Sequence, residues 1–173
     1  MNQPRHPFRI NVGFLFNQPI GYTREIPFEF PVVTFANEVQ FTDFNGTAVF
    51  NRTQPGLLLA GSFKAKTRVT CGRCLEDFDL PIQTDFEEIY TYPGYPLSEN
   101  ETFIPENGTL DLEELIGDFL LLEIPINPIC KEDCKGLCDT CGQNLNLESC
   151  EHNWLDANKE IMEISTTTKK DVP

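Results

Sequence analysis

The sequence predicts an α+β protein, in which an antiparallel β-meander or barrel-like sheet is covered by one or two helices and followed by a C-terminal cysteine-rich segment. Three observations predict this class. Runs of β-branched and aromatic residues, broken by Pro and Gly, fill the first 92 residues. A later segment has helical spacing. Most of the cysteines lie near the C-terminus, in the close pairs that are typical of a zinc knuckle.

The domain expectation follows from the same features. We expect a mainly β domain over residues 1–125, with its covering helix near 111–123. A cysteine-rich zinc-binding segment is expected over residues 126–155, followed by a short helix and a disordered tail over 156–173.

Four strands are expected in the N-terminal part, over residues 8–16, 24–33, 38–44 and 47–53. Prolines in the second strand place it at a sheet edge, because Pro cannot donate to a neighbouring strand. Asn45–Gly46 separates the last two strands, and Asn-Gly is the preferred two-residue hairpin turn. We therefore expect the chain to reverse at Asn45–Gly46.

A longer hairpin is expected next, with strands over 57–70 and 76–92 and Cys-Gly-Arg-Cys at 71–74 between them. Gly61 suggests a bulge in the first strand. The two-residue period of a strand puts the basic side chains of this strand on one face and Phe63 with its apolar neighbours on the other. The basic residues are Lys64, Lys66 and Arg68.

The helix near 111–123 follows a loop, residues 93–108, that is rich in Pro, Gly and Asn. Its apolar residues recur every three or four positions, and Pro125 ends the pattern. An amphipathic helix covering the sheet accounts for this spacing. A second short helix is expected over 154–164.

Charge is distributed unevenly along the chain, whose net charge is −14. Residues 1–70 carry seven basic and four acidic side chains, so the remainder has a net charge of −17. An acidic lobe repels phosphate backbones and attracts basic partners. The sequence has no run of 18 apolar residues and no apolar leader, so we expect a cytoplasmic protein without a membrane partner.

The seven cysteines favour metal binding over disulfides or catalysis. An odd number fits a closed disulfide framework poorly. A thioredoxin-like redox pair should open a helix, whereas Cys71 and Cys74 lie between two strands and Gly142 follows Cys141. In a Cys-x-x-Cys turn both sulfurs converge, and a second pair completes a tetrahedral zinc site.

Eight candidate ligands could serve one or two structural zinc ions. They are Cys71, Cys74, Cys130, Cys134, Cys138, Cys141, Cys150 and His152. Loop closure favours a local knuckle formed by the last four, which leaves the first four to meet across the fold. The alternative joins the Cys71 pair to the Cys138 pair. A hydrolytic zinc is usually held by three ligands rich in His, and the chain has two His, so we predict no enzymatic activity and no small-molecule substrate.

The ordered motifs resemble the YceD family, also called the large ribosomal RNA subunit accumulation proteins of bacteria and plastids. The resemblance rests on "TRVTCGRCLEDF", then "LDLEELIGDFLLLEIPINPIC", then "CKEDCKGLCDTCGQNLN", and it covers roughly residues 10–155. Many relatives end the cluster with Cys-x-Cys, where this chain has His152. The resemblance implies a non-enzymatic role in the accumulation or processing of large-subunit ribosomal RNA.

Two kinds of partner would connect the chain to that role. The basic face of the strand over 57–70 and the loop over 71–74 could contact the phosphates of a large-subunit ribosomal RNA precursor. The contact residues would be Lys64, Lys66, Arg68 and Arg73. The acidic C-terminal lobe could hold a basic ribosomal protein, and its charge favours this second partner. The alternatives are a zinc-binding interaction adaptor unrelated to RNA and a thiol redox protein.

Overall fold

A computed structural model describes residues 7–35, 38–54, 56–92 and 102–152. The chain forms two compact units. The sheet unit comprises Met1–Val69 and Asp79–Ile126, and the cysteine unit comprises Thr70–Phe78 and Asn127–Pro173. All eight candidate metal ligands therefore belong to the cysteine unit, although 56 residues separate Cys74 from Cys130.

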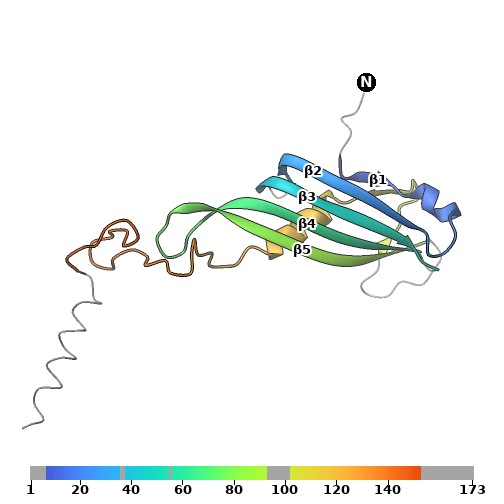
Figure 1. Cartoon of the computed structure of the whole chain (residues 1–173). Helices are drawn as coiled ribbons and strands as arrows, with labels where there is room; N and C mark the ends of the chain where they lie inside the picture. Colours follow the sequence, from blue (N-terminus) through green and yellow to red (C-terminus); the bar gives the residue numbers. More distant parts are fainter. Residues whose placement is uncertain (1–6, 36–37, 55, 93–101, 153–173) are drawn as a thin grey trace, which may run out of the picture. The chain divides into compact units, whose positions relative to one another are not determined.

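The sheet unit is built around a five-stranded sheet of order β2-β3-β4-β5-β6 (Figure 1). β2 pairs antiparallel with β3, and β3 with β4, whereas β6 joins β5 in parallel. The strands are β2 Thr23–Thr34, β3 Gln40–Arg52, β4 Gly56–Thr70, β5 Asp77–Thr91 and β6 Thr102–Phe103. Among the described strands β2 and β6 remain the two edges, so the sheet is open and barrel closure is not found.

The N-terminal segment departs from the expected strand over 8–16. β1 covers only Arg9–Asn11 and pairs with β7, Thr109–Asp111, in a separate two-stranded sheet. The 3₁₀ helix η1, Gly13–Asn17, follows at once. The Asn11 side chain accepts a hydrogen bond of 2.9 Å from the Gly13 N–H, which turns the backbone out of the extended conformation.

The expected hairpin turn at Asn45–Gly46 is wrong. β3 continues through both residues, and Gly46 is paired with Phe28 of β2 and with Phe63 of β4. A Cβ on Gly46 would lie 2.5 Å from the Phe63 ring, so glycine serves close packing between strands here, not a turn. The chain reverses instead after β3, where the Thr53 N–H donates to the Gly56 carbonyl at 3.0 Å.

The bulge expected at Gly61 is also misplaced. The β3–β4 register runs unbroken past Gly61 and shifts between Thr42 and Asn45, where Asp43 has a φ of 52°. This extra residue lets Phe41 and Phe44, three positions apart, both point into the core. Gly61 lies under the Phe86 ring, with which a Cβ would collide.

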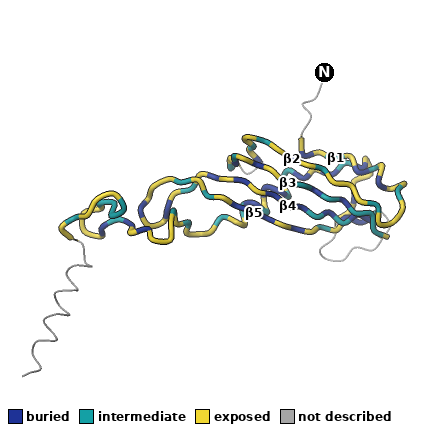
Figure 2. Tube along the Cα trace, in the orientation of Figure 1, coloured by how far each residue is buried: buried dark blue, intermediate teal, exposed yellow. Residues whose placement is uncertain are grey.

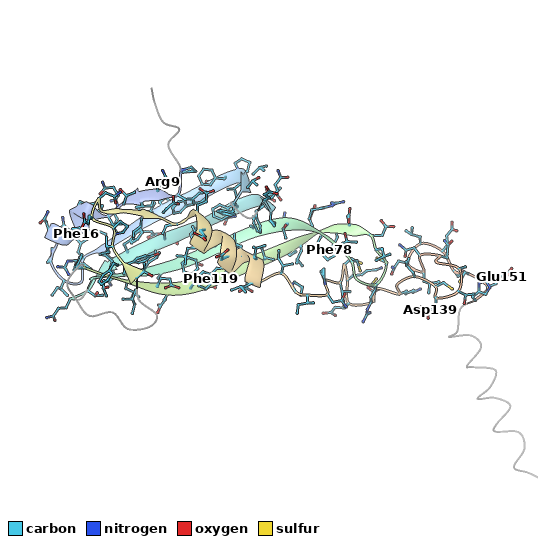
Figure 3. The ribbon with its side chains drawn as sticks, turned by 180° about the vertical axis from the view of Figure 1, so that it is seen from behind. Arg9, Phe16, Phe78, Phe119, Asp139 and Glu151 are labelled. Atoms are coloured by element: carbon cyan, nitrogen blue, oxygen red, sulfur yellow. The ribbon has the colours of Figure 1, made fainter. Side chains whose placement is uncertain are left out.

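Helix α1, Glu113–Leu122, confirms the helix expected near 111–123. The Asp111 carboxylate accepts a hydrogen bond of 3.1 Å from the Glu113 N–H at its start. Ile116 and Leu120 are fully buried. Phe119, labelled on α1 in Figure 3, stacks on Phe86 of β5, and their ring centroids are 4.4 Å apart. The second helix expected over 154–164 lies outside the described residues. No helix within the described ranges is both long and apolar enough to span a membrane.

Burial alternates along β4 as the sequence predicts (Figure 2). Phe63, Ala65 and Thr67 are buried under the helix-covered face, while the basic side chains between them are exposed. Aromatic rings fill the core on this face, for example Phe44 stacked on Phe63 at 5.4 Å. The sheet unit thus has a core of its own, which contains none of the cysteines.

Candidate metal sites

The loop between β4 and β5, Cys71–Glu76, forms a tight turn. The Cys71 N–H donates to the Glu76 carbonyl at 2.9 Å, and the Leu75 N–H donates to the Cys71 carbonyl at 3.0 Å. Leu75 has a φ of 60°, in the left-handed region. This conformation closes the turn and directs the Cys71 and Cys74 thiols to one point.

A second turn, Cys138–Gln143, has the same hydrogen-bond pattern. The Cys138 N–H donates to the Gln143 carbonyl and the Gly142 N–H to the Cys138 carbonyl, both at 2.8 Å. Gly142 stands where Leu75 stands in the first turn and has a φ of 73°. Left-handed backbone is ordinary for glycine and uncommon for leucine.

Hydrogen bonds within the cysteine unit hold the C-terminal segment against the first turn. The Gly72 N–H donates to the Pro128 carbonyl at 2.8 Å, and the Leu137 N–H donates to the Arg73 carbonyl at 3.1 Å. A Cβ on Gly72 would collide with the Asn127 side chain, so only glycine permits this approach. These contacts bring Cys130 and Cys134 to the Cys71 pair.

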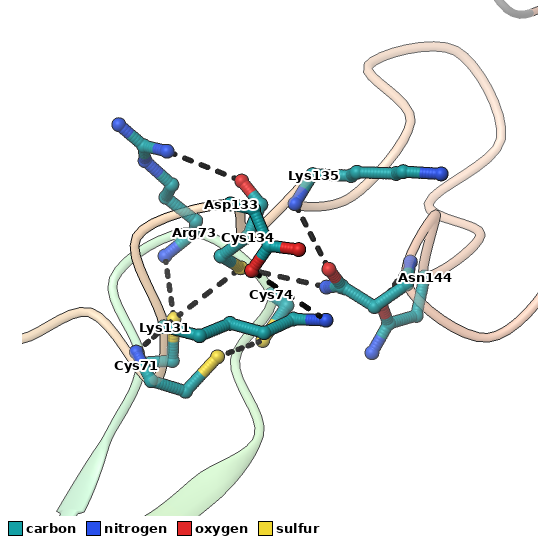
Figure 4. A network of polar contacts seen from close by, with 10 residues as sticks. Cys71, Arg73, Cys74, Lys131, Asp133, Cys134, Lys135 and Asn144 are labelled. Atoms are coloured by element: carbon teal, nitrogen blue, oxygen red, sulfur yellow. Dashed lines mark hydrogen bonds and ion pairs between the residues drawn. The ribbon is translucent and has the colours of Figure 1, made fainter.

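The first sulfur quartet consists of Cys71, Cys74, Cys130 and Cys134, whose Sγ atoms all lie within 4.8 Å of one another (Figure 4). The Sγ atoms of Cys71 and Cys134 are 3.8 Å apart, and those of Cys74 and Cys130 are 3.7 Å apart. A tetrahedron with zinc–sulfur bonds of about 2.3 Å has edges of about 3.8 Å, whereas a disulfide bond is about 2.05 Å. The quartet fits a zinc ion, and its thiols are free.

Several N–H groups donate hydrogen bonds to the sulfur atoms of this quartet, as expected for metal-binding thiolates. The Cys71 Sγ accepts hydrogen bonds of 3.4 Å from the Arg73 and Cys130 N–H groups. The Asn146 side-chain amide donates to the Cys134 Sγ, also at 3.4 Å. Such donors stabilise thiolates, the form in which cysteine binds a metal.

The pKa values of these thiols diverge. The Cys74 N–H, which donates to the Cys71 sulfur, lowers the pKa of Cys71 to about 6. Burial and the neighbouring thiols raise the pKa of Cys130 to about 12. Thiolates this close repel one another, so all four ionise together only beside a cation.

The second quartet consists of Cys138, Cys141, Cys150 and His152, whose ligand atoms also lie within 4.8 Å of one another. Cys141 and His152 are exposed, and only Cys138 is buried. The Cys141 N–H, which donates to the Cys138 sulfur, lowers the pKa of Cys138 to about 7. Loop closure favours the same two quartets, and their occupation by zinc remains a prediction.

Three of the four candidate RNA-contact residues already have partners. Lys66 forms an ion pair with Asp43 at 2.8 Å and Arg68 with Asp79 at 3.1 Å, and all four side chains are at least half exposed. The Arg73 guanidinium donates to the Cys134 carbonyl at 3.1 Å. Lys64 lies near Asp85, whose pKa is lowered by hydrogen bonds from Ser62 and Gln83 and by the Lys64 charge.

Sequence reasoning missed the two asparagines of "GQNLN". Asn144 donates to the Glu76 carboxylate at 3.4 Å, which ties this segment to the first turn. The Asn146 side chain receives the Lys135 N–H at 2.9 Å and donates to the Cys134 Sγ. The amide-rich run Gln143–Asn146 after the Cys138–Gly142 turn was the available signal, because hydrogen bonds from neighbouring residues orient metal ligands.

Comparison with known proteins gives one family. The family model described as large ribosomal RNA subunit accumulation protein YceD matches residues 59–163. An uncharacterised protein of Mycobacterium tuberculosis is 36% identical over 97 residues, which cover 54% of this chain and 47% of that protein. An uncharacterised protein of Mycobacterium leprae is 34% identical over 96 residues, which cover 53% of this chain and 44% of that protein.

A plant relative carries a more informative name. The large ribosomal RNA subunit accumulation protein YCED homolog 1, chloroplastic, of Arabidopsis thaliana is 45% identical over 49 residues, 28% of this chain and 15% of that protein. The matched segments thus span about half the length of the mycobacterial relatives and less of the plant protein. No solved structure matches the chain.

Proposed function

Because the chain belongs to the YceD family, the large ribosomal RNA subunit accumulation proteins, we propose that it supports the accumulation of large-subunit ribosomal RNA as a zinc-stabilised binding protein. The observation that carries the proposal is the pair of quartets, each with four protein ligand atoms within 4.8 Å of one another. Four protein ligands complete the tetrahedral coordination of a zinc ion and leave no position for water or substrate. Zinc then stabilises a binding surface and does not catalyse a reaction.

The proposed metal-binding unit joins the tip of the β4–β5 hairpin to residues 127–152. Eight ligands from two regions of the sequence bind two structural zinc ions. The first ion connects both regions, and the second closes the local turn around Cys138. Metal binding of this kind contributes directly to the folding free energy of small domains that lack a large apolar core.

The proposed partners are a large-subunit ribosomal RNA precursor and a basic ribosomal protein. Lys66 and Arg68 are paired with carboxylates, which reduces the net charge that they offer to phosphates. The net charge of −17 beyond residue 70 favours the protein partner. Cytoplasmic location remains a prediction.

Two measurements test this proposal. Elemental analysis of the purified full chain should give about two zinc ions per chain. In the source organism, deletion of the gene should lower the ratio of large- to small-subunit ribosomal RNA, and the wild-type gene should restore it. A normal ratio in the deletion strain would overturn the role in RNA accumulation, and purified chain without metal would overturn the zinc assignment.

A further inference from the structure

The first turn contains a residue that its own fold does not explain. Leu75 occupies the left-handed position of the turn with a φ of 60°, and its side chain is 63% exposed. The second turn meets the same geometric requirement with Gly142. A bulky side chain in the left-handed region is strained, and such strain persists where function requires the side chain.

The exposed leucine is not part of the apolar cluster of its own unit. The apolar cluster of the cysteine unit consists of Cys71, Cys74 and Cys134, with Phe78 and Cys130 packed against it, and does not include Leu75. Leu147 is exposed as well, at 73%. The Leu147 N–H donates to the Asn144 carbonyl at 3.1 Å, and the Asn144 side chain donates to the Glu76 carboxylate at 3.4 Å. Leu147 therefore belongs to a segment that is hydrogen-bonded to the residue after Leu75.

The cysteine unit that carries Leu75 is acidic. The described residues of the cysteine unit carry seven acidic side chains, all exposed, against three basic ones. The acidic residues include Glu76 and Asp77, which follow Leu75 directly. Asp139 and Glu151 lie in the segment of the second quartet (Figure 3). Of the basic residues, Arg73 is engaged with the Cys134 carbonyl and Lys131 lies 3.9 Å from Asp133. A filled zinc–thiolate centre would add further negative charge.

We propose that Leu75 is the apolar anchor of a protein-docking surface on the cysteine unit, and that its partner is a lysine- and arginine-rich protein segment with an apolar site for the leucine. An exposed apolar anchor inside a charged rim is typical of protein interfaces. The net acidic charge of the unit favours a basic protein over nucleic acid, because phosphates would face uncompensated carboxylates. This inference rests on the proposed function, since it identifies the protein partner of that assembly role.

The test uses zinc-loaded full chain and large-subunit ribosomal proteins of the source organism, freed of RNA and purified one by one. Binding is measured for wild type, Leu75→Ala and Leu75→Gly, with Leu122→Ala as the matched control, because Leu122 is 79% exposed on the sheet unit. We expect at least one basic protein to bind wild type and Leu122→Ala equally, and both Leu75 variants at least about tenfold more weakly. Zinc content and thermal stability of Leu75→Gly should not fall, because glycine relieves the strained backbone.

Three results would overturn the proposal. Unchanged affinity of the Leu75 variants would show that the leucine is not an anchor. The absence of binding to every purified protein would remove the partner. Leucine-dependent binding to naked large-subunit ribosomal RNA would assign the surface to nucleic acid. The ratio of large- to small-subunit ribosomal RNA in the deletion strain tests the proposed function separately. Failure of the docking surface and failure of the assembly role are therefore distinguishable.

Discussion

The two quartets share a turn geometry and differ in what they connect. The first joins Cys74 to Cys130 across 56 residues, and three of its four cysteines are buried. The second takes all its ligands from Cys138 to His152, and only one of the four is buried. A distant cross-link restricts the unfolded chain more than a local one. We therefore expect metal binding at the first quartet to determine whether the cysteine unit forms, and metal binding at the second to add local order at its end.

The largest expected effect comes from breaking the first quartet. Cys71→Ser should release one zinc per chain and remove hydrogen-exchange protection from residues 71–76 and 127–137, because structural zinc is worth on the order of 10 kcal/mol to small domains. The sheet unit should keep its protection, since its core contains no cysteine. Thr140→Ser, an exposed conservative change, is the control. Loss of protection throughout β2–β5 would contradict the separation of the two units.

Breaking the second quartet should have a smaller and local effect. Cys138→Ser should release the other zinc and raise exchange only over residues 138–152. The hydrogen bonds of the first turn do not involve this loop's metal ligands, so protection of residues 71–76 should remain. Elemental analysis and exchange measured on the same sample check this expectation. Loss of both zinc ions would show that the quartets depend on each other.

A still smaller effect is expected from the amide that the sequence did not reveal. Asn146→Ala removes the 3.4 Å hydrogen bond to the Cys134 Sγ and should weaken zinc binding at the first quartet by about 10- to 100-fold. Competition with a chromophoric chelator measures this affinity. Gln143→Ala is the control, because Gln143 bonds Cys138 through its backbone oxygen. Equal affinities of the two variants would remove Asn146 from the site.

Substitution of the left-handed residues, Leu75 and Gly142, should have the smallest effect and compares the two turns directly. Gly142→Leu should lower the free energy of unfolding by about 1 kcal/mol, because leucine is strained at a φ of 73°. Leu75→Gly should leave this free energy unchanged or raise it by up to about 1 kcal/mol. Chemical denaturation of zinc-loaded protein measures both. Marked destabilisation by Leu75→Gly would mean that the leucine side chain supports the fold.

Much of the sheet unit could be predicted because local pattern and tertiary contacts agree. β4, β5 and α1 have strong two-residue or helical periods, and the structure places them where these periods predict. The turn predicted at Asn45–Gly46 was wrong, because the same dipeptide suits both a hairpin turn and a place where two neighbouring strands approach closely. The choice depends on Phe63 of β4, which no local window contains.

The sequence alone determined which atoms are available to a metal, since thiols in Cys-x-x-Cys pairs converge whatever surrounds them. It also determined the acidic charge of the C-terminal half. Only the tertiary structure decided which pairs lie together, because the hydrogen bonds from Gly72 and Leu137 that bring Cys130 and Cys134 to Cys71 join residues far apart in the chain. It alone revealed that Leu75 holds a conformation suited to glycine, because backbone strain is a property of the folded turn and not of the residue.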